Sequence, residues 1–273
     1  MMVLNTFWRY AVATFLFLLS FLSYLIGLSI TFNPYLIPLW LLVAYLLAFL
    51  TALVIYLIQL PLVLALPSTN MYKFYLMKSI AKLVNHFVIR LKVTVHGLEH
   101  IPKDGRLVIY ANHKSYSDGF ALLEVFTRPM TFTPKKSVMK IPFVGLWLKS
   151  YDVFPINRKN PRETFDSMEV AVEAVKKGLT ISFFPEGTIQ YRHHEEVTEM
   201  KSGAFKLAQK AESNILIVRF DGNDLTKRRT PFRSTRRHLT IFPVVNYETI
   251  KEMSSHEIAK RVMDTINKKQ LQF

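Results

Sequence analysis

The sequence contains no cysteine, so disulfide bonds, thiolate zinc sites and thiol nucleophiles are all excluded. The absence also fits a reducing cytosol. No Gly-x-Ser-x-Gly elbow occurs either, the motif that presents a nucleophilic serine in many hydrolases. We therefore expect a hydroxyl that reacts here to belong to a substrate rather than to the protein.

The first 70 residues contain no acidic side chain and a single cation, Arg9. Two almost unbroken apolar runs fill this segment, Phe7 to Phe32 and Tyr35 to Leu66, and each exceeds the ~20 helical residues that cross a bilayer core. Asn33-Pro34 breaks the helical pattern, which predicts a hairpin with both ends on one side. The first run lacks the short apolar core and the small-residue cleavage site of a signal peptide. We expect a membrane-anchoring helical hairpin over residues 1–70.

Pro38 and Pro61 leave a second arrangement open, a shallower re-entrant or interfacial hairpin. The orientation follows from the cations after the second run, because cytoplasmic segments beside a membrane are rich in Lys and Arg and the turn has none. These cations predict that the rest of the chain lies on the cytoplasmic face. They are Lys73, Lys78, Lys82, Arg90 and Lys92.

The chain beyond residue 70 holds all 20 acidic residues and all but one of the 35 Lys and Arg residues, a net charge of +14. Such a surface attracts phosphate, either in nucleic acid or in anionic lipid. The densest basic run, Lys227 to Arg237, is not surrounded by a nucleic-acid-binding motif. With a membrane anchor at the N-terminus, we expect anionic membrane lipid as a partner and no nucleic acid.

Residues 71–91 predict an amphipathic linking helix. Lysines stand opposite an apolar stripe, which leaves two placements open: a helix on the membrane surface, or a domain helix that covers a sheet. The apolar residues are Tyr72, Tyr75, Leu76, Ile80, Leu83 and Phe87, and the lysines are Lys73, Lys78 and Lys82.

From residue 92 to residue 273, short β-rich runs alternate with helical patterns, which predicts an α/β domain with a largely parallel mixed sheet flanked by helices. Sites in such sheets gather at the carboxyl ends of strands. The expected strands are Val93–Val95, Leu107–Tyr110, Met130–Thr133, Val153–Phe154, Leu179–Phe184, Ile215–Phe220 and His238–Val245. The expected helices are Phe120–Phe126, Val138–Ser150, Arg162–Lys177, Lys201–Ala211 and His256–Lys268.

His113 and Asp118 lie between an expected strand and an expected helix. Five residues apart on a regular helix they would face different sides, so they meet only if the loop turns back and Asp118 enters the first helical turn. A carboxylate on one ring nitrogen would fix the tautomer of His113 and support its imidazolium, which is the arrangement of a general base. The alternative is a loop histidine beside a helix-capping aspartate.

A second candidate motif, Phe184-Pro185-Glu186-Gly187-Thr188, begins at the last residue of the expected strand Leu179–Phe184. Proline stops the strand, Gly187 lets the backbone turn close to a ligand, and Thr188 offers a hydroxyl. Glu186 would accept hydrogen bonds from substrate hydroxyls there, or else it is a solvated acid in a turn.

Cations follow two further strands. Arg158 could bind a phosphate through its fork of N–H donors, and Lys136 could add a point charge. The run His193-His194-Glu195-Glu196 has the composition of metal ligands, but adjacent ligands seldom converge on one ion, so we expect a solvated loop and no metal.

In order along the chain, four motifs resemble those of the glycerolipid acyltransferase family, and most closely its 1-acyl-glycerol-3-phosphate (lysophosphatidic acid) acyltransferases. The likeness covers about residues 92–250. The motifs are Asn112-His113-x-Ser115-x-x-Asp118, Pro142-x-x-Gly145 leading to Asn157-Arg158, Phe184-Pro185-Glu186-Gly187-Thr188, and Lys201-x-Gly203-Ala204.

The resemblance implies transfer of a fatty acyl group from acyl-CoA or acyl-carrier protein to the free sn-2 hydroxyl of lysophosphatidic acid, which gives phosphatidic acid. It implies that His113 is the general base and that Asp118 orients it. It also implies phosphate binding by Arg158 and Lys136, and glycerol contacts from Glu186, Gly187 and Thr188. No cofactor is expected beyond the acyl donor, whose phosphates could also meet the basic run.

The chain departs from the family pattern at four positions, where Ile189, Ile217, Asn157 and Asp152 stand for a frequent Arg, Pro, Asp and Gly. These departures concern the acceptor headgroup and the acyl preference more than the reaction. Two other functions stay open: an acyltransferase for another lysophospholipid or glycerol 3-phosphate, and a membrane adaptor without catalysis that binds anionic lipid.

Overall fold

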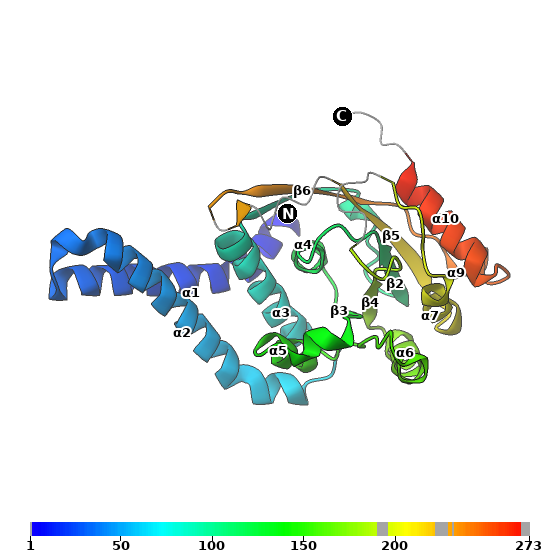
Figure 1. The fold of residues 1–273 in the computed structure, drawn as a ribbon, viewed down its shortest axis with the longest axis horizontal. Coiled ribbons are helices and arrows are strands. Elements are labelled where there is room, and N and C mark those ends of the chain that lie inside the picture. The colour runs from blue at the N-terminus through cyan, green and yellow to red at the C-terminus, as the bar shows by residue number, and fades with distance from the viewer. Residues whose placement is uncertain (1, 190–195, 222–228, 231, 269–273) are drawn as a thin grey trace.

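The computed structural model describes residues 2–189, 196–221, 229–230 and 232–268. An N-terminal helical hairpin projects from an α/β domain, and in Figure 1 it extends to the left of the sheet and its covering helices. The expected class is confirmed, because the domain is a mixed sheet flanked by helices and follows two long apolar helices.

Helices α1 (Met2–Thr31) and α2 (Ile37–Ala65) form the hairpin. The side chain of Asn33 caps the turn between them, where it accepts a hydrogen bond of 2.9 Å from the N–H of Tyr35. Both helices are long and apolar enough to cross a membrane, and large apolar side chains along them, such as Ile58, are exposed. These faces fit membrane association, while the choice between spanning and re-entrant geometry and the cytoplasmic orientation stay predictions.

Helix α3 (Met71–Leu83) and the π-helical turn η2 (Val84–Ile89) lead from the hairpin to the sheet. Side chains of α3 such as Phe74 and Met77 are buried in the core that lies between the sheet and α4. Of the two placements left open by the sequence, the contacts of α3 are those of a domain helix.

The expected position of two lysines on α3 is wrong. Lys73 and Lys78 are both buried, although the sequence pattern sets them opposite the apolar stripe. Each has a polar partner inside the protein, which makes burial of an ammonium group tolerable. Lys73 forms a 2.6 Å ion pair with Asp152, and Lys78 donates a hydrogen bond to the carbonyl of Phe126.

Six strands form one sheet in the order β1-β6-β5-β2-β4-β3. All neighbours are parallel except β5 and β6, which run antiparallel. The carboxyl ends of β2, β4 and β5 therefore meet at one edge of the sheet. The strands are β1 (Leu91–His96), β2 (Leu107–Ala111), β3 (Met130–Phe132), β4 (Thr180–Phe183), β5 (Asn214–Asp221) and β6 (Thr235–Ile241).

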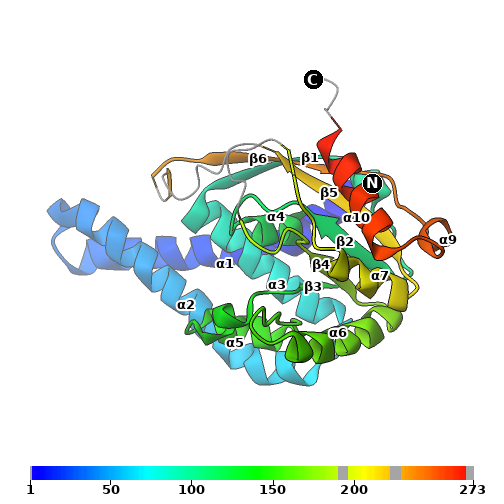
Figure 2. The same ribbon diagram turned by 45° about the vertical axis from the view of Figure 1, so that its right-hand side comes forward.

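Helices cover both faces of the sheet, as Figure 2 shows. Alternate residues of the central strand β2 point to opposite sides, so Val108 packs in one core and Ile109 in the other. The first core lies under α6 (Pro161–Lys176), α7 (Lys206–Lys210), α9 (Tyr247–Ile250) and α10 (Ser255–Asn267). The second lies under α3, α4 (Asp118–Val125) and the C-terminal part of α2.

The helix expected over Val138–Ser150 is two shorter elements, the 3₁₀ helix η4 (Lys136–Lys140) and α5 (Val144–Ser150). Between them, Pro142 cannot continue the hydrogen-bond pattern and Phe143 has a left-handed φ of 61°. A glycine is required at position 145, because a Cβ there would lie 2.0 Å from the carbonyl oxygen of Met139. Similarly, the helix expected over Lys201–Ala211 begins as the 3₁₀ turn η5 (Ser202–Phe205) before α7.

Two expected strands are also corrected. Val153–Phe154 is not a strand; the chain there runs beside β3 through single backbone bonds and one bridge between Lys135 and Ile156. The strand expected over His238–Val245 starts earlier and ends at Ile241, because it pairs with β1 from its first residue and Pro243 lacks an N–H for the ladder.

Candidate active site

His113 and Asp118 meet in the loop that joins β2 to α4. The His113 Nδ1 atom lies 3.1 Å from Oδ2 of Asp118, which is the first residue of α4. The same oxygen accepts 2.7 Å hydrogen bonds from the backbone N–H groups of Lys114 and Ser115. The loop therefore wraps around one carboxylate oxygen, which is the turn that the sequence spacing requires for the two side chains to converge.

Two contacts hold the ring of His113 and one holds its backbone, and the first ring contact is that with Asp118. Its ring stacks on that of Phe184 at a centroid distance of 4.3 Å and an angle of 23°. Its backbone N–H donates a 2.7 Å hydrogen bond to Oε1 of Glu186. Its side chain is 19% exposed, whereas that of Asp118 is fully buried. Because Nδ1 is engaged by the carboxylate, Nε2 is the nitrogen left for a substrate.

Asn112 joins the loop that carries His113 to the neighbouring strand β5. Its side-chain amide donates to the carbonyl of Phe220 at 3.0 Å, and its oxygen accepts from the N–H of the same residue at 2.6 Å. Both bonds are buried. Sequence reasoning gave Asn112 no role of its own, although an amide beside the candidate histidine at a strand end was the available signal.

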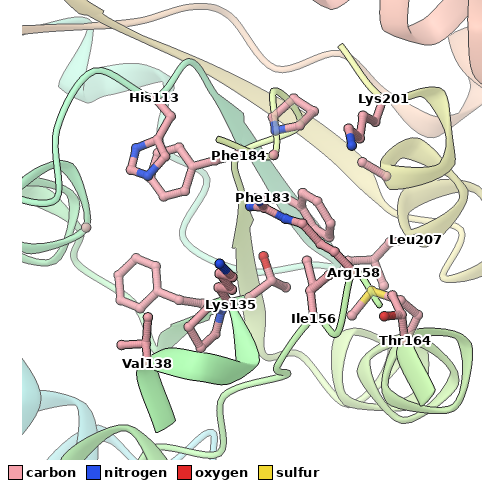
Figure 3. A pocket seen from close by; sticks show the side chains of 18 of the residues that line it. His113, Lys135, Val138, Ile156, Arg158, Thr164, Phe183, Phe184, Lys201 and Leu207 are labelled. Atoms are coloured by element: carbon pink, nitrogen blue, oxygen red, sulfur yellow. The ribbon is translucent and has the colours of Figure 1, made fainter. Parts of the chain in front are cut away.

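A cavity of about 1010 Å³ opens beside His113. Figure 3 shows His113 and Phe184 at one side of this cavity, with Arg158, Lys135 and Lys201 pointing into it. Much of the lining is apolar and comes from α4, β3, η4 and α5. These apolar residues are Phe120, Leu123, Phe132, Val138, Val144, Trp147 and Leu148.

The cations at the cavity fall into two groups. Within the part of the chain that the structure describes, Lys135, Arg158, Lys201 and Lys206 line the cavity and form no ion pair with a carboxylate. Lys210 also lines it but pairs with Glu169.

The structure separates Lys136 from this cavity. It is not among the lining residues, and its ammonium group pairs with Glu163 on α6. Its neighbour Lys135 lines the cavity instead. In an irregular segment, two consecutive side chains can lie on opposite sides of the backbone. No periodic pattern in the sequence predicts which of the two faces the cavity.

The turn Glu186-Gly187-Thr188 follows β4 at the same sheet edge. Thr188 lines the cavity, and its hydroxyl makes no hydrogen bond within the described residues. Gly187 has a φ of 73°, and a Cβ there would lie 3.3 Å from Cε of Lys201, which packs over the turn. Glu186 is buried beneath the His113 loop and is not a lining residue, so its contact differs from the expected one with substrate hydroxyls.

Burial raises the pKa of Glu186, which outweighs the lowering by the hydrogen bond from His113 and by the cation of Lys114. Burial also lowers the pKa of Lys114, against the attraction of Glu186 and Asp221. The edge of the sheet thus carries buried charged groups that depend on one another.

Two further charged segments of the sequence, the His-His-Glu-Glu run and the basic run, lie partly outside the described residues. Residues 193–195 of the His-His-Glu-Glu run lie outside the described residues, and no group of three metal-binding side chains occurs within them. Of the basic run from 227 to 237, the structure describes residues 229, 230 and 232–237. Its last residue, Arg237, is buried rather than exposed to lipid.

Comparison with known proteins assigns the chain to a family. The family model described as Acyltransferase matches residues 92–245, which contain the loop, the turn and the cavity. The chain belongs to the acyltransferase family.

Relatives of this acyltransferase carry a consistent name. A 1-acyl-sn-glycerol-3-phosphate acyltransferase of Borreliella burgdorferi is 26% identical over 72% of this chain and 78% of its own length. The enzyme of that name from Saccharomyces cerevisiae is 34% identical, over 50% of this chain and 45% of its own. A chloroplastic enzyme of Arabidopsis thaliana is 31% identical, and the match spans 38% of its length.

The fold is similar to that of a solved structure. The crystal structure of the 1-acyl-sn-glycerophosphate (LPA) acyltransferase PlsC from Thermotoga maritima matches with a TM-score of 0.56. It is 24% identical, and the match covers 72% of this chain and 82% of that one. The similarity supports the sheet topology and the flanking helices described above.

Proposed function

We propose that this acyltransferase moves a fatty acyl group from the thioester of acyl-CoA or acyl-carrier protein to the sn-2 hydroxyl of lysophosphatidic acid. The observation that carries the proposal is the His113–Asp118 pair beside a largely apolar cavity, which also holds cations without a carboxylate partner among the described residues. The names of the relatives support the same acceptor.

The reaction uses His113 as a general base. Asp118 holds the Nδ1–H, so Nε2 takes the proton of the acceptor hydroxyl as its oxygen attacks the thioester carbonyl carbon. The tetrahedral intermediate then breaks the carbon–sulfur bond, and the departing sulfur receives the proton from the imidazolium. The products are the new ester and a free thiol, with no covalent enzyme intermediate.

The cations explain the choice of a phosphorylated acceptor. Arg158 offers a planar fork for phosphate oxygens, and Lys135 and Lys201 add point charges from the two sides of the cavity. Because these three have no carboxylate partner among the described residues, their charge is available to a ligand. The apolar lining from α4 and α5 suits the hydrocarbon part of a fatty acyl chain.

The test is acyl transfer by the full-length protein in detergent micelles, with labelled acyl-CoA and lysophosphatidic acid. His113→Ala should lower kcat at least about a thousandfold while the Tm stays near that of the wild type. His238→Ala, which removes an exposed histidine of β6, is the matched control and should keep full activity. Near-normal turnover by His113→Ala would remove the general base from the mechanism.

A panel of acceptors separates the related functions. Lysophosphatidic acid should outcompete glycerol 3-phosphate and lysophosphatidylcholine for the labelled acyl group. Preference for one of those acceptors would reassign the substrate within the family. Lipid binding without any release of thiol from acyl-CoA would instead support an adaptor.

We also propose that the domain lies on the cytoplasmic face. Since the chain has no cysteine, a single cysteine introduced on the exposed side of α6 would be the only target for a maleimide that cannot cross membranes. Labelling only after the cells are opened would agree with this orientation, and labelling of intact cells would contradict it.

A further inference from the structure

The basic run that the sequence assigns to lipid headgroups ends at a residue with no exposed surface, Arg237. Burial alternates along β6, and Arg237 shares the inward side with Leu239 and Ile241. Arg237 does not line the cavity, so it has no access to a substrate there. A buried guanidinium is costly unless it meets an opposite charge.

That opposite charge is Asp118. Its Oδ2 forms the hydrogen bonds with the loop that carries His113, whereas its Oδ1 accepts no hydrogen bond within the described residues. The Nε atom of Arg237 lies 3.8 Å from Oδ1, and both side chains are fully buried. The guanidinium is therefore the counter-ion on the side of the carboxylate that faces away from His113.

We propose that Arg237 is a positioning residue, which keeps the Asp118 carboxylate ionised and in place so that it can orient His113. The inference rests on the proposed role of the His113–Asp118 pair. The ion pair connects Arg237 on β6, near the C-terminal end of the domain, with Asp118 near its N-terminal end.

The other charged groups near Asp118 do not replace this cation. His113 and Lys114 stand on the same loop, and Glu186 comes from the turn after β4. Lys114 is attracted by Glu186 and Asp221 as well as by Asp118, so its charge is shared among three carboxylates. Arg237 makes the ion pair from β6 that faces Oδ1.

Removal of a nearby positive charge favours protonation of the coupled acid and base. Without Arg237, protons should therefore stay on the Asp118–His113 pair up to a higher pH. A protonated Asp118 no longer fixes the Nδ1–H tautomer of His113. We expect loss of turnover rather than of substrate affinity, since Arg237 lies outside the cavity.

The experiment measures kcat and KM against pH for Arg237→Met in the full-length protein, with lysophosphatidic acid and labelled acyl-CoA. At neutral pH kcat should fall at least about tenfold with little change in either KM, and the acid limb of kcat/KM should move to higher pH. Lys92→Met is the matched control, because it removes an exposed cation from the neighbouring strand β1 and should change neither quantity.

A second background separates positioning from simple structural support. In Asp118→Asn, which has no charge to stabilise, Arg237→Met should cost less than about threefold in kcat. Equal losses in both backgrounds, or an unmoved acid limb, would overturn the inference. If Arg237→Met fails to fold, Arg237→Gln, which removes the charge but keeps a polar side chain, carries the same two comparisons. Full activity of Asp118→Asn alone would instead contradict the proposed function.

Discussion

The backbone N–H of His113 donates a 2.7 Å hydrogen bond to Oε1 of Glu186. The carboxylate lies under the His113 loop and joins the end of β2 to the turn after β4. Its partner is the backbone of the loop, so the bond fixes where the imidazole stands before any substrate arrives. Two of the motifs that are separate in the sequence are thus one structural unit.

Glu186 should act through this bond. Glu186→Gln retains an oxygen that can accept from the N–H of His113, so it should keep kcat within about threefold of the wild type. Glu186→Ala leaves that N–H without its acceptor, which costs about 1.5–3 kcal/mol, or roughly ten- to a hundredfold in kcat. Steady-state kinetics of the two variants decide this. A large loss in Glu186→Gln as well would instead indicate direct contact with the substrate.

The same residue should also make stability depend on pH. Burial raises the folded-state pKa of Glu186 above its unfolded value, so its favourable contribution is present below the unfolded pKa and is lost as pH rises through the folded pKa. Glu186→Gln, which stays neutral, should have a higher Tm than the wild type at pH 7 to 8. The difference should close as the pH approaches 4.

Glu257 provides a control of opposite sign. It caps α10 through a hydrogen bond with the N–H of Ser254, which lowers its pKa. Its contribution is present above the unfolded pKa and is lost as pH falls through the folded pKa. Glu257→Gln should therefore lower Tm at pH 7, and its difference from the wild type should shrink on acidification. The same sign for both variants would contradict the buried environment of Glu186.

Cavity cations that lack a carboxylate partner among the described residues should contribute more to acceptor binding than a paired cation outside the cavity. Arg158→Ala and Lys201→Met should raise KM for lysophosphatidic acid at least about tenfold, because a charge-assisted hydrogen bond to phosphate is worth about 1.5–3 kcal/mol. KM for a monoacylglycerol, which lacks phosphate, should change little. Lys136→Met should leave both values within about twofold, since Lys136 pairs with Glu163 outside the cavity. Equal effects on both acceptors would remove a residue from the phosphate site.

Gly145 should be intolerant of a side chain. A Cβ at this position would lie 2.0 Å from the backbone oxygen of Met139, so Gly145→Ala must push α5 away from η4 and should cost about 1–3 kcal/mol of stability. Gly203→Ala is the matched control, because nothing lies within 4 Å of its Cβ position. Thermal unfolding in detergent compares the two. A Tm for Gly145→Ala equal to that of the control would contradict the close packing.

Lys78 should limit stability near neutral pH. Burial lowers its pKa to about 7, against the attraction of Glu124. A depressed folded pKa means that the stability is present above the unfolded pKa and is lost as pH falls through the folded pKa. Between pH 10 and pH 7 the wild type should lose on the order of 3–5 kcal/mol through this residue. Lys78→Met should lose much less over the same range, which thermal unfolding at several pH values measures.

Much of the fold follows from local pattern. Long apolar runs without charge can only be membrane or core helices, and alternation of β-rich and helical segments favours a sheet covered by helices. The errors fall where local pattern carries no information. Pro142 and Phe143, whose φ is positive, divide one expected helix. Lys73 and Lys78 are buried because each has a polar partner inside the protein, Asp152 for the first and a backbone carbonyl for the second.

By itself, the sequence determined the chemical groups of the site, because the spacing of His113 and Asp118 allows one turn that unites them and the neighbouring strand ends collect at one edge of the sheet. Only the tertiary structure decided which charges act together. It directs Lys135 to the cavity and Lys136 to Glu163, places Glu186 under the loop, and brings Arg237 behind Asp118 from a strand 119 residues later. Such pairings depend on burial and on distances between segments far apart in the chain, which no local pattern encodes.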